Sequence, residues 1–130
     1  MTGPTLWRTD GGIDATTHSP LKRLFICSRN RIRSLTAERI FAGVPGWDVR
    51  SAGTQPGARI VVTEGMIGWA DVVVAMEKSH LQRLRERFPE AMAARDAVVL
   101  GIPDEFVIMQ PELVHELRGG MELAFGVELE

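Results

Sequence analysis

The sequence holds a single cysteine and no apolar run long enough for a membrane helix, and both shortages limit what the chain can be. One cysteine cannot form an intramolecular disulfide, which fits a reducing compartment. No run approaches the roughly 20 apolar residues that a membrane helix requires, and residues 1–20 contain no apolar core of a secretion signal. We therefore expect a cytoplasmic protein that does not bind a membrane.

Metal ligands and excess charge are also scarce. The three histidines share no spacing and form no zinc-binding set with one cysteine, so they are expected on the surface or as helix caps. The formal net charge of −2 gives no overall reason to bind nucleic acid. Nucleotide-binding glycine motifs and a Gly-x-Ser-x-Gly motif are absent as well. We therefore expect no metal, no cofactor and no nucleic-acid partner.

The composition is that of one globular domain. The chain has 130 residues, of which 45% are hydrophobic and 25% are charged. Residues 1–20 lack periodicity and predict a flexible tail, so the domain is expected to span 21–130. Apolar runs predict four strands, at 23–26, 47–51, 71–76 and 97–101. Amphipathic or capped segments predict helices at 34–42, 64–69, 79–88 and from Pro111 onward, the last interrupted by Gly119-Gly120.

Strands that alternate with helices predict an open α/β fold. We expect a parallel four-stranded sheet with helices on both faces. In such sheets ligands bind at the carboxyl ends of the strands. Cys27, Ser51, Met76 and Asp104 all fall at predicted strand ends, so the chemistry is expected at that edge.

The segment around Cys27 carries the strongest chemical pattern. An apolar strand ends at Cys27, a short polar loop follows, and a helix begins near Ser34. This geometry directs backbone N–H groups and the positive end of a helix toward one point, which attracts anions. A thiolate at such a point is stabilised and acts as a nucleophile. Arg33 can fold back as a planar fork for phosphate oxygens, so the segment predicts a phosphate-binding loop with its own nucleophile.

Several loop residues have a specific expected role. Asn30 suits the left-handed conformation that a tight loop requires, and the Ser34 hydroxyl can cap the helix or donate to the sulfur. Arg29 and Arg31 are either solvated surface charges or they make the mouth of the site more positive and favour acidic substrates. The residues expected to bind phosphate beside Cys27 and Arg33 are Ser28, Arg29, Asn30, Arg31, Ile32 and Ser34.

The spacing Cys27-x5-Arg33-Ser34 after an apolar strand resembles the signature of low-molecular-weight protein tyrosine phosphatases. Further pieces recur in the order that this family shows: Asn30, Ala37-Glu38, Ser51-Ala52-Gly53-Thr54, Ala70-Asp71, Met76 and Pro103-Asp104. The resemblance covers residues 22–117 and is closest to a compact branch of the family. It implies the family's flavodoxin-like, three-layer architecture.

The resemblance also implies a cysteine-dependent phosphatase that hydrolyses phosphotyrosine or an aryl phosphate. Its partner would be a phosphorylated protein or a small aryl phosphate. Cys27 is then the nucleophile, Arg33 holds the phosphate oxygens, and water hydrolyses the phosphocysteine. Asn30 is implied as support for the loop, with Ser34 and Ser51 as its partners.

The leaving group needs a proton donor, and the resemblance points to one. Asp104 stands where the family's general acid stands, with Glu105 as a rival. Phe106 matches an aromatic residue that flanks the substrate ring, or else it belongs to the core. A second aromatic wall is missing, because the chain reaches Gly57 where relatives often carry one. The missing wall counts against a site that is specific for phosphotyrosine.

Two other functions fit the same pattern. The fold supports arsenate reduction, but thioredoxin-linked versions relay electrons through additional cysteines, so only a version that uses a small thiol fits this chain. The other alternative is a catalytically weak module that binds phosphate or phosphopeptides. Slow turnover together with tight phosphate binding would indicate the binding module.

Overall fold

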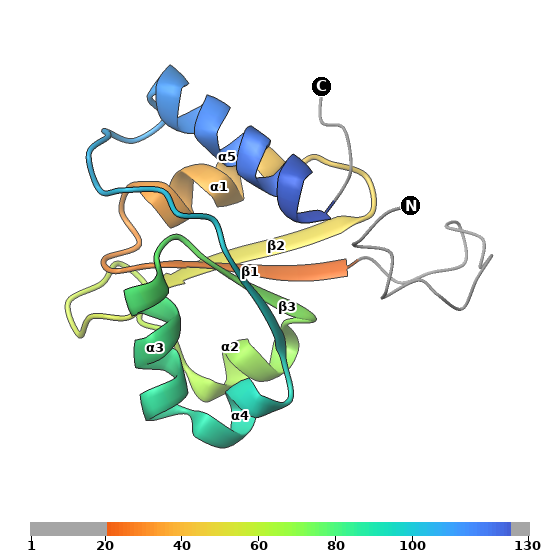
Figure 1. Cartoon of the computed structure of the whole chain (residues 1–130), viewed down its shortest axis with the longest axis vertical. Coiled ribbons are helices and arrows are strands. Elements are labelled where there is room, and N and C mark those ends of the chain that lie inside the picture. The colour runs from red at the N-terminus through yellow and green to blue at the C-terminus, as the bar shows by residue number, and fades with distance from the viewer. Residues whose placement is uncertain (1–20, 126–130) are drawn as a thin grey trace.

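The computed structural model describes residues 21–125, so the predicted tail at 1–20 and the last residues of the predicted domain, 126–130, lie outside the described residues. At its centre is a sheet of four strands in the order β2-β1-β3-β4 (Figure 1). All strand pairs are parallel, as predicted, so the carboxyl ends point to one edge of the sheet. The strands are β1 Leu21–Cys27, β2 Trp47–Gly53, β3 Val72–Ala75 and β4 Asp96–Val99.

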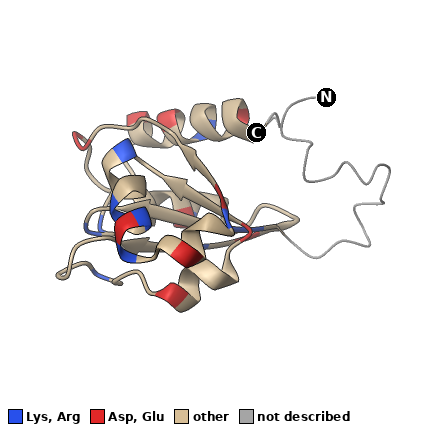
Figure 2. Cartoon of the chain, turned by 60° about the horizontal axis from the view of Figure 1, so that its bottom comes forward, with Lys and Arg blue, Asp and Glu red and all other residues tan. Residues whose placement is uncertain are grey.

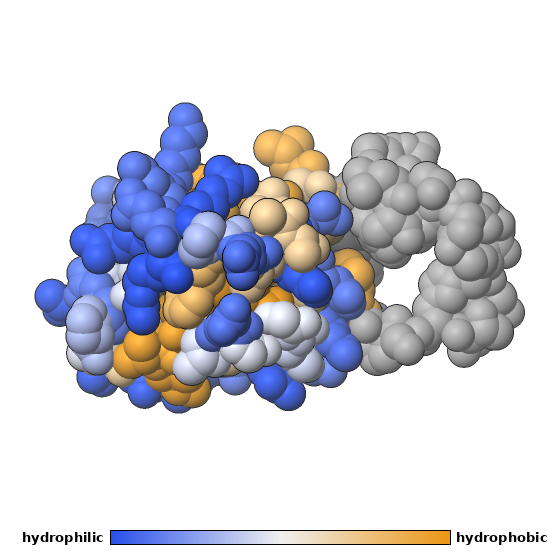
Figure 3. All heavy atoms as spheres, turned by 90° about the horizontal axis from the view of Figure 1, so that it is seen from below, coloured by the Kyte–Doolittle hydropathy of each residue, from blue (hydrophilic) through white to orange (hydrophobic). Residues whose placement is uncertain are grey.

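Helices cover both faces of the sheet, which confirms the three predicted layers. α1 Arg33–Phe41 and α5 Pro111–Phe125 lie on one face (Figure 1). The other face carries α2 Glu64–Trp69, α3 Lys78–Arg87 and α4 Pro89–Ala93. Seen from the side of α3 and α4, the surface is mainly hydrophilic, with apolar residues in patches between charged ones (Figure 3). Within residues 21–125, no helix is long and apolar enough to cross a membrane.

The two central strands separate two apolar cores. Phe25 of β1 packs toward α1 and α5, in one cluster with Phe41 and Leu117. Leu24, its neighbour in the strand, packs on the opposite face in a cluster with Ile67 of α2. All five side chains are fully buried, and burial of each such side chain contributes about 1.5–3 kcal/mol. Packing on both faces holds β1 firmly, and β1 ends at Cys27.

Helix α5 is continuous where the sequence predicted an interruption at Gly119-Gly120. Leu117, Met121 and Phe125 recur at helical spacing and are buried in the core. Gly120 also lies against Leu100, where a Cβ would come within 3.3 Å of the leucine side chain. A glycine costs about 1 kcal/mol relative to alanine inside a helix. Burial of three large side chains outweighs that cost, so the prediction of an interruption was wrong.

The region between α3 and α5 differs from the sequence prediction in two further ways. Helix α4 is absent from that prediction, although the proline at its first position is a helix-start signal. Strand β4 ends at Val99, because Gly101 leaves the strand with a φ of +74°. Backbone N–H groups of Leu100 and Ile102 still donate to the chain at the end of β3. These bonds guide the segment after β4 along the carboxyl edge of the sheet.

The carboxyl end of β2 lies directly against the loop that follows β1. A Cβ at Gly53 would lie 2.6 Å from the carbonyl oxygen of Ser28, so this close approach requires glycine. Beyond it, the backbone N–H of Gln55 donates to the Ser28 carbonyl at 3.0 Å, and that of Arg59 donates to the Arg29 carbonyl at 2.9 Å. The segment after β2 therefore fixes the backbone of the loop that carries Cys27 at its start.

Candidate active site

The loop between β1 and α1 folds around the sulfur of Cys27. Asn30 has a φ of +58°, the left-handed conformation that asparagine tolerates. Its Nδ2 donates to Ser34 Oγ at 2.8 Å, and its backbone N–H donates to Cys27 Sγ at 3.3 Å. Ser34 Oγ lies 3.0 Å from the same sulfur and 3.5 Å from the Ala52 carbonyl. Because the hydroxyl accepts from Asn30, it can donate to the nearer sulfur, and both donors stabilise negative charge there.

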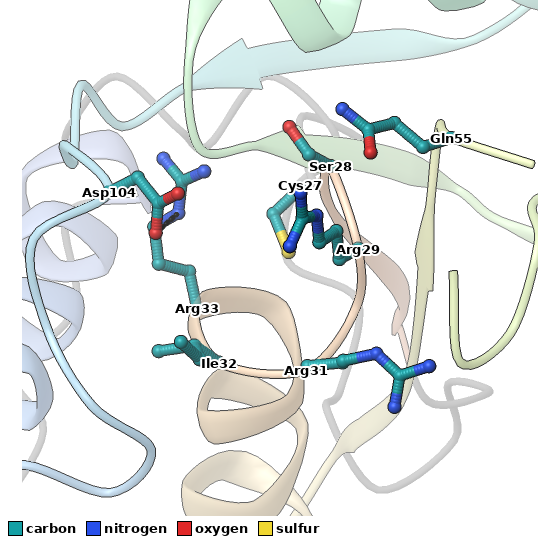
Figure 4. Close-up of a pocket in the computed structure, with 8 residues that line it drawn as sticks. All are labelled: Cys27, Ser28, Arg29, Arg31, Ile32, Arg33, Gln55 and Asp104. Atoms are coloured by element: carbon teal, nitrogen blue, oxygen red, sulfur yellow. Dashed lines mark ion pairs between the residues drawn. The ribbon is translucent and has the colours of Figure 1, made fainter. Parts of the chain in front are cut away.

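A cavity of about 290 Å³ lies over Cys27, whose side chain forms part of its floor (Figure 4). Seven of its lining residues are among those singled out from the sequence: Cys27, Ser28, Arg29, Arg31, Ile32, Arg33 and Asp104. Gln55 also lines it and was missed, although its place just beyond the end of β2 was an available signal. Asn30 and Ser34 are completely buried and lie behind the sulfur rather than in the cavity.

Arg33 is surrounded by oxygen atoms that orient its guanidinium. The side chain is 3% exposed, and Nη1 donates to the Ile102 carbonyl at 2.8 Å and pairs with Glu77 Oε1 at 3.1 Å. Its Nε lies 3.9 Å from Asp104 Oδ1. Glu77 was not singled out from the sequence, although it directly follows Met76 at the carboxyl end of β3. Its position at that edge was the signal that could have found it.

Asp104 lines the cavity, and Glu105 does not. The Asp104 side chain is 67% exposed and stands beside the guanidinium of Arg33 (Figure 4). Phe106 lies partly buried against the core formed by α1 and α5, outside the cavity lining. Of its two expected roles, the structure therefore favours the core. The chain turns from Asp104 toward α5, and this packing draws the aromatic ring inward.

Ser51 has a hydrogen-bond partner other than Asn30, contrary to the expectation that the two are partners. Its hydroxyl donates to a carboxylate oxygen of Glu38 on α1. In the parallel register Ser51 pairs with Phe25, two positions before the strand ends at Gly53. At that level its side chain reaches α1 rather than the loop. Ser51 therefore ties β2 to α1 and supports the site only indirectly.

His80 has a larger place in the site than the sequence suggested. It forms a capping box with Glu77 at the start of α3, and a helix cap was one of its two expected roles. The side chain is also buried, with 2% of its surface exposed. Its Nδ1 accepts the backbone N–H of Glu77 at 3.0 Å, and its Nε2 lies 3.0 Å from Ser28 Oγ. An accepting Nδ1 carries no hydrogen, so in the neutral ring Nε2–H donates to Ser28. The proton of the Ser28 hydroxyl can then point to a ligand in the cavity.

Burial keeps His80 neutral. Its pKa is lowered from the usual 6.5 to about 4, chiefly because burial disfavours the charged ring. The positive charges of Arg33 and Arg83 lower the pKa further, whereas Glu77 and Asp104 oppose the shift. The neutral ring that donates to Ser28 is therefore the state present at neutral pH.

We expect the free energy of unfolding to fall as the pH is lowered from 6.5 toward 4, because unfolded His80 then binds a proton that the folded residue does not. A pKa shift of this size corresponds to about 3 kcal/mol. Urea denaturation across that pH range measures the effect. His80→Gln is the comparison, because its amide can accept from Glu77 and donate to Ser28 without titrating. The variant should lose stability less steeply on acidification, and equal slopes would rule out the lowered pKa.

No protein-family model and no curated protein sequence matches the chain, but solved structures do. The tyrosine phosphatase Wzb from Escherichia coli K30, in complex with phosphate, is 21% identical to this chain, with a TM-score of 0.66. The match covers 81% of this chain and 96% of the Wzb chain. A low-molecular-weight protein tyrosine phosphatase from T. tengcongensis is 24% identical, with a TM-score of 0.63, covering 82% and 99%. The YwlE arginine phosphatase from Geobacillus stearothermophilus is 22% identical, with a TM-score of 0.54, covering 82% and 87%.

At these identities the likeness establishes the fold. The chain has the fold of low-molecular-weight protein tyrosine phosphatases, as the resemblance of the Cys27 segment implied. Among residues 21–125, no group of three or more His, Cys, Asp or Glu side chains could hold a metal ion. At the carboxyl edge of the sheet the structure thus brings together a cysteine, a buried arginine and an exposed carboxylate.

Proposed function

We propose that the protein is a phosphomonoester hydrolase that acts on phosphotyrosine or another aryl phosphate through a phosphocysteine intermediate. The observation that carries this proposal is the surroundings of Cys27 Sγ. The Asn30 N–H at 3.3 Å and Ser34 Oγ at 3.0 Å both contact the sulfur, and Cys27 lines a cavity that Arg33 also lines. The likeness to phosphatases of known structure supports the same activity.

In the proposed reaction, the Cys27 thiolate attacks phosphorus in line with the leaving oxygen. The loop N–H groups and the Arg33 guanidinium hold the three nonbridging oxygens and stabilise the charge of the transition state. Asp104 gives its proton to the leaving oxygen as the P–O bond breaks. Water then attacks the phosphocysteine, Asp104 takes the proton of that water, and Cys27 departs as a thiolate, which releases inorganic phosphate.

The proposed substrate is a phosphorylated protein or a small aryl phosphate, with no nucleic acid or membrane as partner. We place the protein in the cytoplasm, because reducing conditions there keep a lone thiol available for chemistry. Arsenate reduction is the weaker alternative. A thioredoxin-linked relay needs further cysteines, and Cys27 is the only cysteine of the sequence.

Rapid mixing with p-nitrophenyl phosphate in the presence of a chelator tests the proposal. We expect hydrolysis that the chelator does not reduce. After acid quenching, mass spectrometry should find one added phosphoryl group on the peptide that contains Cys27. Loss of activity on chelation, or phosphate on another residue, would contradict the covalent mechanism. Tight phosphate binding without turnover would indicate a binding module instead.

The general acid can be located by changing the two neighbouring carboxylates. Asp104 lines the cavity and Glu105 does not, so Asp104→Asn should slow phenyl phosphate by about a hundredfold, and p-nitrophenyl phosphate less, because a basic leaving group depends most on an acid. Glu105→Gln should keep the wild-type dependence on the leaving group. The measurement is kcat for both variants across aryl phosphates of graded leaving-group acidity. A steeper dependence in Glu105→Gln would place the acid one residue further along.

A further inference from the structure

The cavity over Cys27 has two sides that differ in charge. Asp104 stands on one side beside Arg33, and Arg31 and Gln55 stand on the other (Figure 4). None of the eight described residues that line the cavity is aromatic. A bound aryl phosphate therefore meets mainly charged and polar side chains, and no aromatic side chain that could stack against the ring of the substrate. Selection among substrates at this site should depend on charge.

Backbone carbonyl groups orient two of the arginine side chains near the mouth, which is the entrance of the cavity over Cys27. Arg31 Nη2 lies 3.5 Å from the Gly57 carbonyl, which directs this side chain toward the segment after β2. A third arginine, Arg59, donates from Nε to the Asn30 carbonyl at 3.1 Å and from its backbone to the Arg29 carbonyl at 2.9 Å. Figure 2 shows basic residues on the loops at the left edge of the molecule, to which the strands point. The mouth thus carries more positive charge than one phosphate-binding arginine supplies.

Arg29 and Arg31 differ from Arg33 in their partners. Arg33 has carboxylates nearby, from Glu77 at 3.1 Å and Asp104 at 3.9 Å. Within the part of the chain that the structure describes, no carboxylate lies within ion-pair distance of Arg29 or Arg31, and both side chains are exposed. Exposed guanidinium groups without a carboxylate offer planar donors to an incoming anion. Arg31, on the side opposite Asp104, and Arg29, beside Cys27, can together bind an anion in addition to the phosphoryl group.

We propose that Arg29, Arg31 and Gln55 form a second anion subsite. The preferred substrates are then aryl phosphates that carry a further carboxylate or phosphate close to the phosphoryl group. The inference rests on the proposed phosphatase function and adds the class of substrate. The phosphoryl group lies at Cys27, the leaving oxygen faces Asp104, and the second anion faces the subsite. The same charges disfavour a cationic leaving group, such as a phosphorylated arginine side chain.

Two phosphotyrosine peptides test the subsite, one with glutamate and one with glutamine on both sides of the phosphotyrosine. The leaving phenol is the same in both, so only the flanking charge differs. We expect wild type to prefer the glutamate peptide by about tenfold in kcat/KM, about 1.4 kcal/mol, and the preference should shrink with added salt. A second pair, 3-carboxyphenyl phosphate and its neutral carboxamide, identifies the source of the anion. Preference in this pair indicates that small molecules suffice, and preference in the peptides alone indicates an acidic peptide.

A double variant, Arg29→Gln with Arg31→Gln, should bring the charged-to-neutral ratio to within about twofold, about 0.4 kcal/mol. The matched control is Arg39→Gln with Arg85→Gln, which removes the same charge from exposed positions on α1 and α3. This control should keep the wild-type ratio. Each ratio compares two substrates on one protein, so a general loss of activity in a variant does not change it.

Equal kcat/KM for the charged and neutral members of both pairs, on an enzyme that hydrolyses p-nitrophenyl phosphate, overturns the subsite and leaves the phosphatase function standing. A control variant that loses the preference as fully as the Arg29 and Arg31 variant also overturns it, because net charge then explains the effect. If the wild-type protein hydrolyses none of these phosphates, the proposed function fails and the subsite fails with it.

Discussion

Cys27→Ser is expected to abolish turnover of p-nitrophenyl phosphate while the cavity still binds phosphate. Serine places an oxygen where the sulfur now meets the Asn30 N–H and Ser34 Oγ, so the loop should keep its shape. At neutral pH a hydroxyl is a far weaker nucleophile than a thiolate. We expect kcat to fall by at least about a thousandfold, about 4 kcal/mol in activation free energy.

Calorimetry can measure phosphate binding to the same variant. This measurement distinguishes a variant that has lost only its nucleophile from one that no longer folds. Retained binding with no turnover assigns the nucleophile to Cys27. A Cys27→Ser variant that keeps more than about a tenth of the wild-type kcat, a difference of about 1.4 kcal/mol, would mean that the reaction does not pass through this residue.

Arg33→Lys should be the next most damaging change, although it keeps the positive charge. Arg33 Nη1 contacts both the Ile102 carbonyl and Glu77, while Nε faces Asp104. Lysine has one nitrogen, which cannot keep these contacts and also hold two phosphate oxygens in one plane. Because the fork binds the transition state more tightly than the substrate, kcat should fall as well as affinity. We expect a loss of about a hundredfold in kcat, about 2.7 kcal/mol.

The control for this change is Arg39→Lys, at an exposed position in the last turn of the same helix. Its kcat should stay within about twofold of wild type, about 0.4 kcal/mol. Steady-state kinetics on both variants decide the matter. Arg33→Lys within about threefold of wild type, about 0.7 kcal/mol, would remove Arg33 from the proposed mechanism.

The loop around Cys27 could be predicted from the sequence because its determinants are local. A strand, a tight loop and a helix start follow one another within a few residues, and Asn30 adopts the left-handed conformation that its chemistry allows. The parallel sheet was predictable for a related reason. Continuous apolar runs such as β3 indicate strands that are covered on both faces, and the structure buries all of β3.

Other parts of the site depend on contacts between distant segments. His80 meets Ser28, which lies 52 residues earlier, only because the capping box of α3 sets its ring against the loop. The side on which Phe106 packs depends on α5, and the partner of Ser51 depends on strand register. Local patterns carry no information on such contacts, which explains why the expectations for these residues were incomplete or wrong.

The close contact between Gly53 and the Ser28 carbonyl makes the loop after Cys27 a poor unit for transplantation. Backbone bonds from Gln55 and Arg59 hold the loop from outside its own sequence. A protein engineer who copied only the segment from Cys27 to Ser34 onto another α/β scaffold would leave those carbonyl oxygens without partners. The smallest portable unit is two segments on neighbouring parallel strands, with the glycine that lets them touch. For the same reason, substitutions in residues 53–59 should be accompanied by substitutions in the loop after Cys27 during evolution.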